Sequence, residues 1–198
     1  MGYVRIKPRL KAIQQDERRV KQFREYFKNN LQDKEVWFCD ESGFAADMAP
    51  RKRWAVKGSR PVHYYRGDHL RTNLIGAVAP KSGELESLII SGSDTDVFQY
   101  FLDYLKERTK NRPISLVMDN ASWHHANALK RGNIYPVYLP PYSPELNPIE
   151  ELWKVIKDRF CYAIPPDDIE ELQDRLQRIL QKLFANKNEV KSICKIAY

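Results

Sequence analysis

The sequence predicts an α/β fold in which helices flank a mixed β-sheet. Short apolar runs typical of buried strands alternate with stretches whose apolar residues recur every three or four positions, as in helices. Their order is strand, hairpin, helix, strand, helix, strand, helix, which is typical of a layered α/β domain. A chain of 198 residues is long enough for one sizeable core.

The N-terminal segment, residues 1–33, is expected to be a basic linker that leads into a docking helix. Residues 1–30 carry nine Lys or Arg and three Asp or Glu. The pair Asn29-Asn30 favours an end of the helix within residues 29–34. Apolar residues fall on part of one helical face: Ile13, Val20, Phe23, Tyr26 and Phe27.

The first strand is expected over residues 36–40, an almost entirely apolar run that ends on Asp40. Side chains alternate along a strand, so Asp40 and the following Glu41 should face opposite ways and serve different purposes. A carboxylate at the end of a buried strand needs a cationic partner. The simpler alternative is that Asp40 caps the next turn.

A second basic segment, residues 51–71, holds seven Lys or Arg and one Asp. Aromatic residues lie between its basic ones, which suits contact with a nucleic-acid backbone. A charged hairpin edge is the alternative interpretation, and residues 54–56 fit a short strand. The basic residues expected to contact DNA are Arg51, Lys52, Arg53, Lys57, Arg60, Arg66 and Arg71.

The middle of the chain predicts a hairpin, two helices and two further strands. The turn Lys81-Ser82-Gly83 joins the hairpin, and Ser93 to Asp96 supply helix caps. The second buried strand ends, like the first, near an aspartate, Asp119. The expected elements are strands at 72–80 and 85–90, a helix from about 95 to 109, a strand at 113–120, a short helix at 121–131 and a strand at 134–139.

The stretch from Leu139 to Trp153 organises the rest of the chain. Its prolines favour a stiff, extended loop, and Asn147-Pro148 is a strong helix start. The apolar stripe of that helix places Glu150 at the rim of the core, whereas Glu151 points to solvent. An acidic residue there can also simply complement the helix dipole.

Residues 165–198 are expected to form a helical extension. After Pro165-Pro166, an amphipathic helix should span residues 167–184. Its apolar stripe either packs on its own domain or meets a second subunit. The first arrangement is favoured because the stripe is short, with the basic N-terminal helix as a candidate partner. The stripe comprises Ile169, Leu172, Leu176, Ile179 and Leu183.

Composition excludes several classes of protein. The sequence contains no apolar run of about 18 residues and no secretory signal, so we expect no membrane partner and a cytoplasmic location. Three separate cysteines argue against a disulfide framework and a zinc site. The net charge of +7 is concentrated in the two basic segments, which leaves the rest of the chain acidic. A basic surface around an acidic centre suits a protein that binds polyphosphate.

Three carboxylates are candidates for one site, namely Asp40, Asp119 and Glu150. The ends of central strands are where sites form in open α/β sheets. Carboxylates without a His/Cys cluster suit Mg²⁺ or Mn²⁺ rather than zinc. Two such ions can support phosphodiester cleavage. Asn120 and Asn147 are expected to support the ligands or to cap a helix rather than to bind metal.

The sequence resembles the DDE transposases of the mariner superfamily, most closely the bacterial insertion-sequence branch, over roughly residues 35–162. The most specific motif is the stretch from Leu139 to Trp153. The other matching residues are Asp40 to Phe44, Arg53-Trp54, Lys57 to Pro61, and Met118 to Ala121 with His124.

The resemblance implies a ribonuclease H-like fold, domains at 1–33, 34–164 and 165–198, and a catalytic and metal-binding triad of Asp40, Asp119 and Glu150. By its family position, His124 is expected either to contact DNA or to orient a carboxylate, or else to be purely structural. The family usually places 34 residues between its second aspartate and its glutamate; here there are 150 − 119 − 1 = 30. That loss of about one helical turn leaves the assignment intact.

The implied function is metal-dependent DNA cleavage at transposon ends and strand transfer into target DNA, using Mg²⁺ or Mn²⁺, with two ions per site. Family members carry helix-turn-helix domains upstream, so the expected partners are DNA and such a portion encoded upstream, with a homodimer left open. The expected location is the bacterial cytoplasm, at the nucleoid. The alternatives are a lapsed or domesticated DNA-binding or assembly subunit, and a non-transposing nuclease of the same fold.

Overall fold

A computed structural model describes residues 12–47, 54–67, 69–160, 164–196 and 198. The described strands form one sheet in the order β3-β2-β1-β4-β5. Strand β2 pairs antiparallel with β1 and β3, whereas β4 pairs parallel with β1 and β5, so the predicted mixed sheet is confirmed. The strands are β1 (Val36–Ala45), β2 (Arg71–Ala79), β3 (Glu84–Ile90), β4 (Ile114–Met118) and β5 (Ile134–Tyr138).

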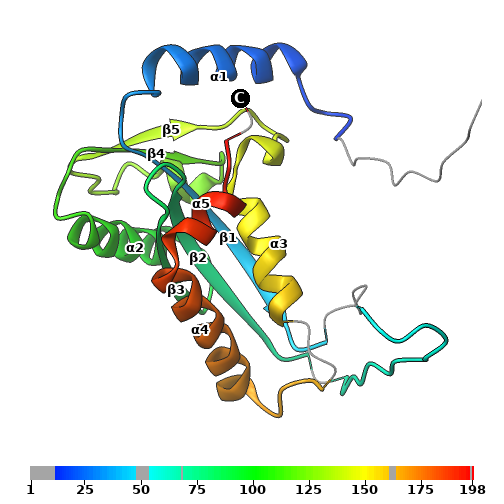
Figure 1. The fold of residues 1–198 in the computed structure, drawn as a ribbon. Helices are drawn as coiled ribbons and strands as arrows, with labels where there is room; N and C mark the ends of the chain where they lie inside the picture. The colour runs from blue at the N-terminus through cyan, green and yellow to red at the C-terminus, as the bar shows by residue number, and fades with distance from the viewer. Residues whose placement is uncertain (1–11, 48–53, 68, 161–163, 197) are drawn as a thin grey trace, which may run out of the picture.

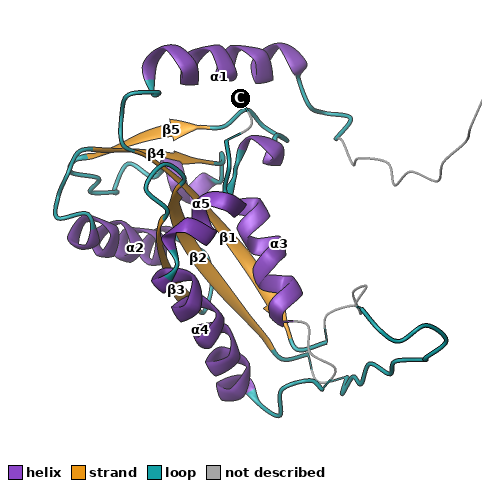
Figure 2. Cartoon of the chain, viewed as in Figure 1, coloured by secondary structure: helices purple, strands orange, loops and turns teal. Residues whose placement is uncertain are grey.

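Helices cover both faces of the sheet (Figures 1 and 2). On one face, α1 (Glu17–Asn30), α3 (Ile149–Phe160), α4 (Ile169–Ala185) and α5 (Lys187–Ile193) contribute to one hydrophobic cluster. On the other face, α2 (Thr95–Arg108) packs in a second cluster. Among the described residues, every helix is too short or too polar to cross a membrane.

Strand β1 divides the core between these two faces. Phe38 and Phe44 lie in the cluster under α3, whereas Trp37 and Cys39 lie in the cluster under α2. This division follows from the alternation of side chains along a strand. Each large apolar side chain buried in this way contributes about 1.5–3 kcal/mol relative to an exposed one.

Three predictions about secondary structure are wrong. Strand β1 does not end at Asp40 but continues to Ala45, because residues 38–45 pair with β2. Residues 54–56 form no strand, and in place of a helix over 121–131 there is only the short 3-10 helix η1 (Ser122–His125). A second 3-10 turn, η2 (Pro144–Leu146), precedes α3.

Helix α4 packs on its own domain, as its short stripe predicted. It lies against α3, β2 and β3, and its N-cap Asp168 accepts a hydrogen bond from the backbone N–H of Glu171. Ile169, the first residue of the predicted stripe, is exposed. The residues that α4 buries are Leu172, Leu176, Ile179, Leu180 and Leu183.

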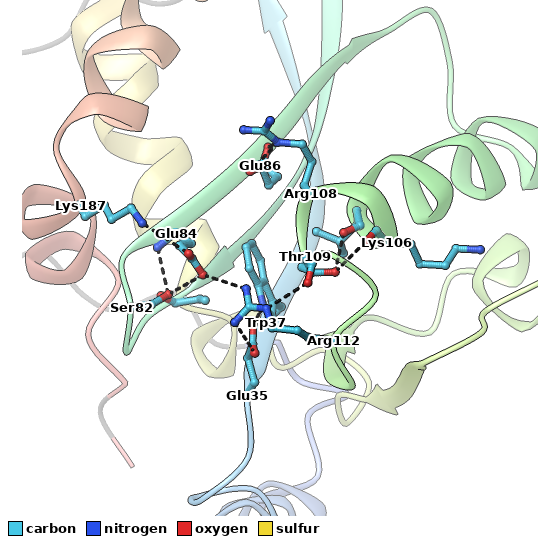
Figure 3. A network of polar contacts seen from close by, with 12 residues as sticks. Glu35, Trp37, Ser82, Glu84, Glu86, Lys106, Arg108, Thr109, Arg112 and Lys187 are labelled. Carbon is cyan, nitrogen blue, oxygen red and sulfur yellow. Dashed lines mark hydrogen bonds and ion pairs between the residues drawn. The ribbon is translucent and has the colours of Figure 1, made fainter.

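A polar network ties the elements together at the end of the sheet where β1 begins (Figure 3). Arg112 Nη1 lies 2.8 Å from Glu35 Oε2, and Arg112 Nη2 lies 3.7 Å from Glu84 Oε2. Lys187 Nζ on α5 lies 3.4 Å from Glu84 Oε1. Ion pairs at the surface contribute about 0–1 kcal/mol each. These pairs link the segment before β1 to β3 and α5.

Candidate active site

The strand register places Asp40 and Asp119 level with each other. In the parallel ladder, Val36 pairs with Ser115 and Phe38 with Val117. Two residues further along, Asp40 and Asp119 therefore stand at the same height, just beyond the last pair. This is the level at which β4 ends, and in open α/β sheets ligands bind beyond the carboxyl ends of the strands.

Asp40 lies in a partly buried environment beside α3. Its Oδ2 accepts a hydrogen bond of 3.0 Å from the indole Nε1 of Trp153. Burial and the negative charges of Glu150 and Glu41 raise the pKa of Asp40 to about 8, although the Trp153 bond opposes the shift. The charge of Glu150 thus acts on Asp40 and disfavours its ionised form.

Glu150 owes its position to Asn147, which precedes α3. The Asn147 Nδ2 donates to the carbonyl oxygen of Cys39 at 3.0 Å, and its Oδ1 accepts from the backbone N–H of Ile149 at 3.4 Å. Asn147 thus caps the helix, as predicted, and also fastens it to the residue before Asp40. Burial raises the pKa of Glu150, and Lys154 and Lys157 act against that rise. Glu151 is exposed and pairs with Lys154 at 2.5 Å.

Asp119 follows the last residue of β4 and is more exposed than the other two carboxylates. Its Oδ1 accepts a hydrogen bond of 3.0 Å from the backbone N–H of Ala121 and lies 2.9 Å from His124 Nδ1. The bond to His124 holds the pKa of Asp119 below its usual value. The neighbouring Asn120 donates its side-chain N–H to the carbonyl oxygen of Leu139.

His124 is completely buried, with 0% of its side chain exposed. Its Nε2 lies 3.3 Å from Glu41 Oε1, so the ring stands between Glu41 and Asp119. Burial lowers the pKa of His124, but the hydrogen bonds to Asp119 and Glu41 outweigh that effect and raise it to about 9. Of the roles expected for His124, orienting a carboxylate fits this geometry, whereas contact with DNA does not.

The basic residues expected to bind DNA are not all described. Arg51, Lys52 and Arg53 lie outside the described residues. Lys57 and Arg60 are exposed on the long connection between β1 and β2, which projects away from the sheet (Figure 1). Arg66 forms an ion pair with Asp167, and its backbone N–H donates to Asp47. Arg71 is exposed at the start of β2.

The chain matches a known protein family over most of its length. The sequence profile described as DDE superfamily endonuclease matches residues 35–173. The chain belongs to the DDE superfamily endonuclease family. The uncharacterised protein y4pE/y4sA of Sinorhizobium fredii is 35% identical over 89 residues, which are 44% of this chain and 66% of that protein.

Solved structures similar to this DDE domain include those of the Mos1 mariner transposase. A Mos1 paired-end complex with Mg superposes with a TM-score of 0.68 at 16% identity, over 98% of this chain and 66% of the Mos1 chain. The isolated Mos1 catalytic domain gives 0.57 at 15% identity, over 96% and 95% of the two chains. The fold is therefore ribonuclease H-like, and the chain spans about two thirds of the length of the relatives it matches.

The donor set of the DDE domain fits a divalent cation in its chemistry. Asp40 and Glu150 both lie in partly buried surroundings, which raise their pKa values. Lys154 and Lys157 oppose the rise at Glu150 without cancelling it. Asp119 stands level with Asp40 but directs its Oδ1 to His124. Within the described ranges, no group of three or more Asp, Glu, His or Cys side chains is placed so that it could hold a metal ion.

Two residues of the site were missed by sequence reasoning. The alternation of side chains along β1 turns Glu41 away from Asp40, and the helical period predicts only that Trp153 belongs to an apolar stripe. A signal for Glu41 existed, because a carboxylate on a buried strand face must find a donor, and buried His124 is one. No sequence signal pointed to the bond between Trp153 and Asp40, which depends on how α3 packs on β1.

Proposed function

We propose that this chain is the catalytic domain of a transposase that cleaves DNA at transposon ends and joins the ends to target DNA. The observation that carries the proposal is the register of β1 and β4, which brings Asp40 on β1 level with Asp119 just after β4, together with the electrostatic effect of Glu150 on Asp40. Membership of the DDE superfamily endonuclease family supports DNA cleavage as the reaction. The Mos1 neighbours support the choice of transposition.

Asp40, Asp119 and Glu150 would hold Mg²⁺ or Mn²⁺, with two ions per site. When bound, such a pair of ions activates the attacking oxygen and stabilises the leaving one. The protein's own contribution is to fix the carboxylates. Trp153 holds Asp40 by its indole N–H, and Asn147 holds the first turn of α3 against β1.

DNA would be bound through phosphate contacts by the basic connection between β1 and β2. The described basic residues are Lys57, Arg60 and Arg66 on this connection and Arg71 at the start of β2. Arg51, Lys52 and Arg53 complete the set. Because phosphate contacts carry no sequence information, recognition of the transposon ends would come from a helix-turn-helix portion encoded upstream. We further propose a member of the bacterial insertion-sequence branch that acts at the nucleoid, with homodimer formation left to experiment.

The test is a strand-transfer assay with a pre-cleaved end that carries a free 3′-OH, taken from the inverted repeats that flank the gene. Transfer of the labelled end into a plasmid in Mg²⁺ or Mn²⁺, lost in Asp40→Asn, supports the proposal. Nicking of the plasmid without joining would identify a non-transposing nuclease. Metal-independent DNA binding with neither reaction would identify a subunit that has lost catalysis.

A further inference from the structure

We propose that Glu41 and His124 are positioning residues, which together hold the Asp119 carboxylate in the orientation needed to bind metal. This inference rests on the proposed function, because it assigns a purpose to residues that surround the same site. Glu41 lies on the face of β1 opposite Asp40, and the sequence predicts no role for that face at the site.

The ring of His124 joins two carboxylates that come from different strands. Its Nδ1 lies 2.9 Å from Asp119 Oδ1, and its Nε2 lies 3.3 Å from Glu41 Oε1. Both ring nitrogens face carboxylate oxygens, which accept hydrogen bonds when ionised, so this arrangement suits a ring that donates from both nitrogens. One oxygen of Asp119 is therefore engaged by His124 and Ala121 N–H together, which leaves Oδ2 outside both contacts.

His124 is itself held rigidly, so the aspartate must adapt to the histidine. The carbonyl oxygen of His124 accepts hydrogen bonds from Arg131 Nη2 at 2.8 Å and from Tyr138 Oη at 3.0 Å. The centre of its ring lies 4.3 Å from that of Phe98 on α2. A half-exposed carboxylate such as Asp119 would otherwise change rotamer freely, and a ligand held loosely binds metal weakly.

Glu41 completes the arrangement from β1. Its side chain is only 15% exposed and lies next in sequence to Asp40, on the other face of the strand. Strand β1 thus acts on the metal site twice, directly through Asp40 and indirectly through Glu41, His124 and Asp119. This arrangement fixes the orientation of Asp119, just after β4, relative to Asp40 on β1.

The first test measures Mn²⁺ affinity by calorimetry in the full chain and in Glu41→Ala, Glu41→Gln, His124→Phe and the double variant Glu41→Ala/His124→Phe. Loss of a residue that orients a metal ligand costs about 10–100-fold in affinity, so both Glu41→Ala and His124→Phe should weaken binding by that factor. Glu41→Gln removes the charge but keeps an acceptor for Nε2, and should stay within about threefold of the wild type by the same reasoning.

The double variant separates positioning from a general charge effect. If Glu41 acts through His124, adding Glu41→Ala to His124→Phe should change the Mn²⁺ affinity by less than about twofold, because coupled residues are not additive. Independent losses that multiply in the double variant would overturn the proposal. So would a loss in Glu41→Gln as large as that in Glu41→Ala. Glu151→Gln, which changes an exposed carboxylate paired with Lys154, is the control and should bind Mn²⁺ like the wild type.

A metal-free measurement keeps this inference separate from the proposed function. In the wild type, the His124 Nδ1–H should exchange slowly with solvent in an NMR experiment, and Glu41→Ala should speed that exchange at least about tenfold. Glu41→Gln should not. Unchanged protection in Glu41→Ala would overturn the inference even if DNA is cleaved. If the wild type binds Mn²⁺ no better than Asp119→Asn, the proposed function fails, and the NMR result alone then decides whether Glu41 positions Asp119.

Discussion

Gly76 on β2 and Trp153 on α3 approach so closely that a Cβ on Gly76 would lie 2.8 Å from Cη2 of Trp153. Gly76 is also the partner of Asp40 in the antiparallel ladder, and Asp40 accepts the Trp153 indole N–H at 3.0 Å. The missing side chain at residue 76 therefore makes the space in which the indole reaches the carboxylate.

Gly76→Ala is accordingly expected to destabilise the fold and to displace the indole from Asp40. Forcing a methyl group into a packed core costs about 1–3 kcal/mol. Chemical denaturation should show that loss, and near-ultraviolet circular dichroism should show a changed tryptophan environment. Gly92→Ala is the control, because a Cβ there would meet nothing within 4 Å, and it should be nearly neutral. Equal stability of the two variants would contradict the packing argument.

Asp40→Asn, Asp119→Asn and Glu150→Gln should each abolish cleavage supported by Mg²⁺ or Mn²⁺ while the protein stays folded. Each change removes a charged oxygen ligand and keeps the shape of the side chain. Cleavage of a labelled end duplex, with circular dichroism for folding, is the measurement.

The matched control for Glu150 is Glu151→Gln. Glu151 is the next residue of α3, but its side chain is exposed and pairs only with Lys154 in the described structure. Its loss should leave cleavage within about twofold, because an exposed pair contributes about 0–1 kcal/mol. Loss of cleavage in Glu151→Gln, with cleavage retained in Glu150→Gln, would mean that the wrong carboxylate has been assigned.

The stability of the metal-free protein should fall as pH rises because of Asp40. Its pKa is about 8 in the folded chain and 3.8 in its ordinary state. A raised pKa favours the protonated form in the folded state, so the stabilisation is complete below about pH 4 and is lost as pH rises toward 8. The loss should amount to a few kcal/mol, on the order that a shift of this size implies.

Denaturation between pH 5 and 9 without metal is the measurement, and Asp40→Asn is the comparison. His124, whose pKa is also raised, loses stabilisation in the upper part of the same window, so the difference between the two proteins isolates Asp40. Asp40→Asn should be the more stable protein above pH 8, and Mg²⁺ should stabilise only the wild type there. If the stabilities of the wild type and Asp40→Asn changed in parallel with pH, burial would not raise the pKa of Asp40.

DNA binding should weaken steeply with salt and show little sequence preference. Each neutralised phosphate contributes about −0.9 to the slope of log affinity against log salt. Replacing both exposed Lys57 and Arg60 by Gln should therefore reduce the slope by about 1.8 in a fluorescence-anisotropy titration. Arg178→Gln with Lys182→Gln, on the exposed face of α4, is the control and should leave the slope unchanged. Salt-insensitive binding to one sequence would contradict the phosphate model.

Much of this architecture could be predicted from the sequence, because the apolar periodicities are strong. The hairpin, α2, α3 and α4 were all predicted, and the self-packing of α4 followed from the shortness of its stripe. The end of β1 was not predictable in this way. Residues 41–45 include Glu41, Ser42 and Gly43, which have poor strand propensity, and only pairing with β2 makes them a strand.

Candidate ligands could be named from the sequence, but the contacts that support them could not. Asp119 and Glu150 lie close to the ends of recognisable elements, and Asp40 ends an apolar run, although β1 continues beyond it to Ala45. The contacts of Trp153, Asn147 and Glu41 join residues that are distant in sequence, so no local pattern encodes them. Helix α5 escaped prediction because seven residues are too few to show a period.

The bond between Trp153 and Asp40 gives the protein an optical reporter of its own site. Indole emission responds to the electric field around the ring, and Trp153 is buried with its N–H directed at a carboxylate. A cation bound at Asp40, as proposed above, would change that field without the need for a label. The difference in fluorescence between the wild type and Trp153→Phe thus follows occupancy of the site in real time, before any DNA is added.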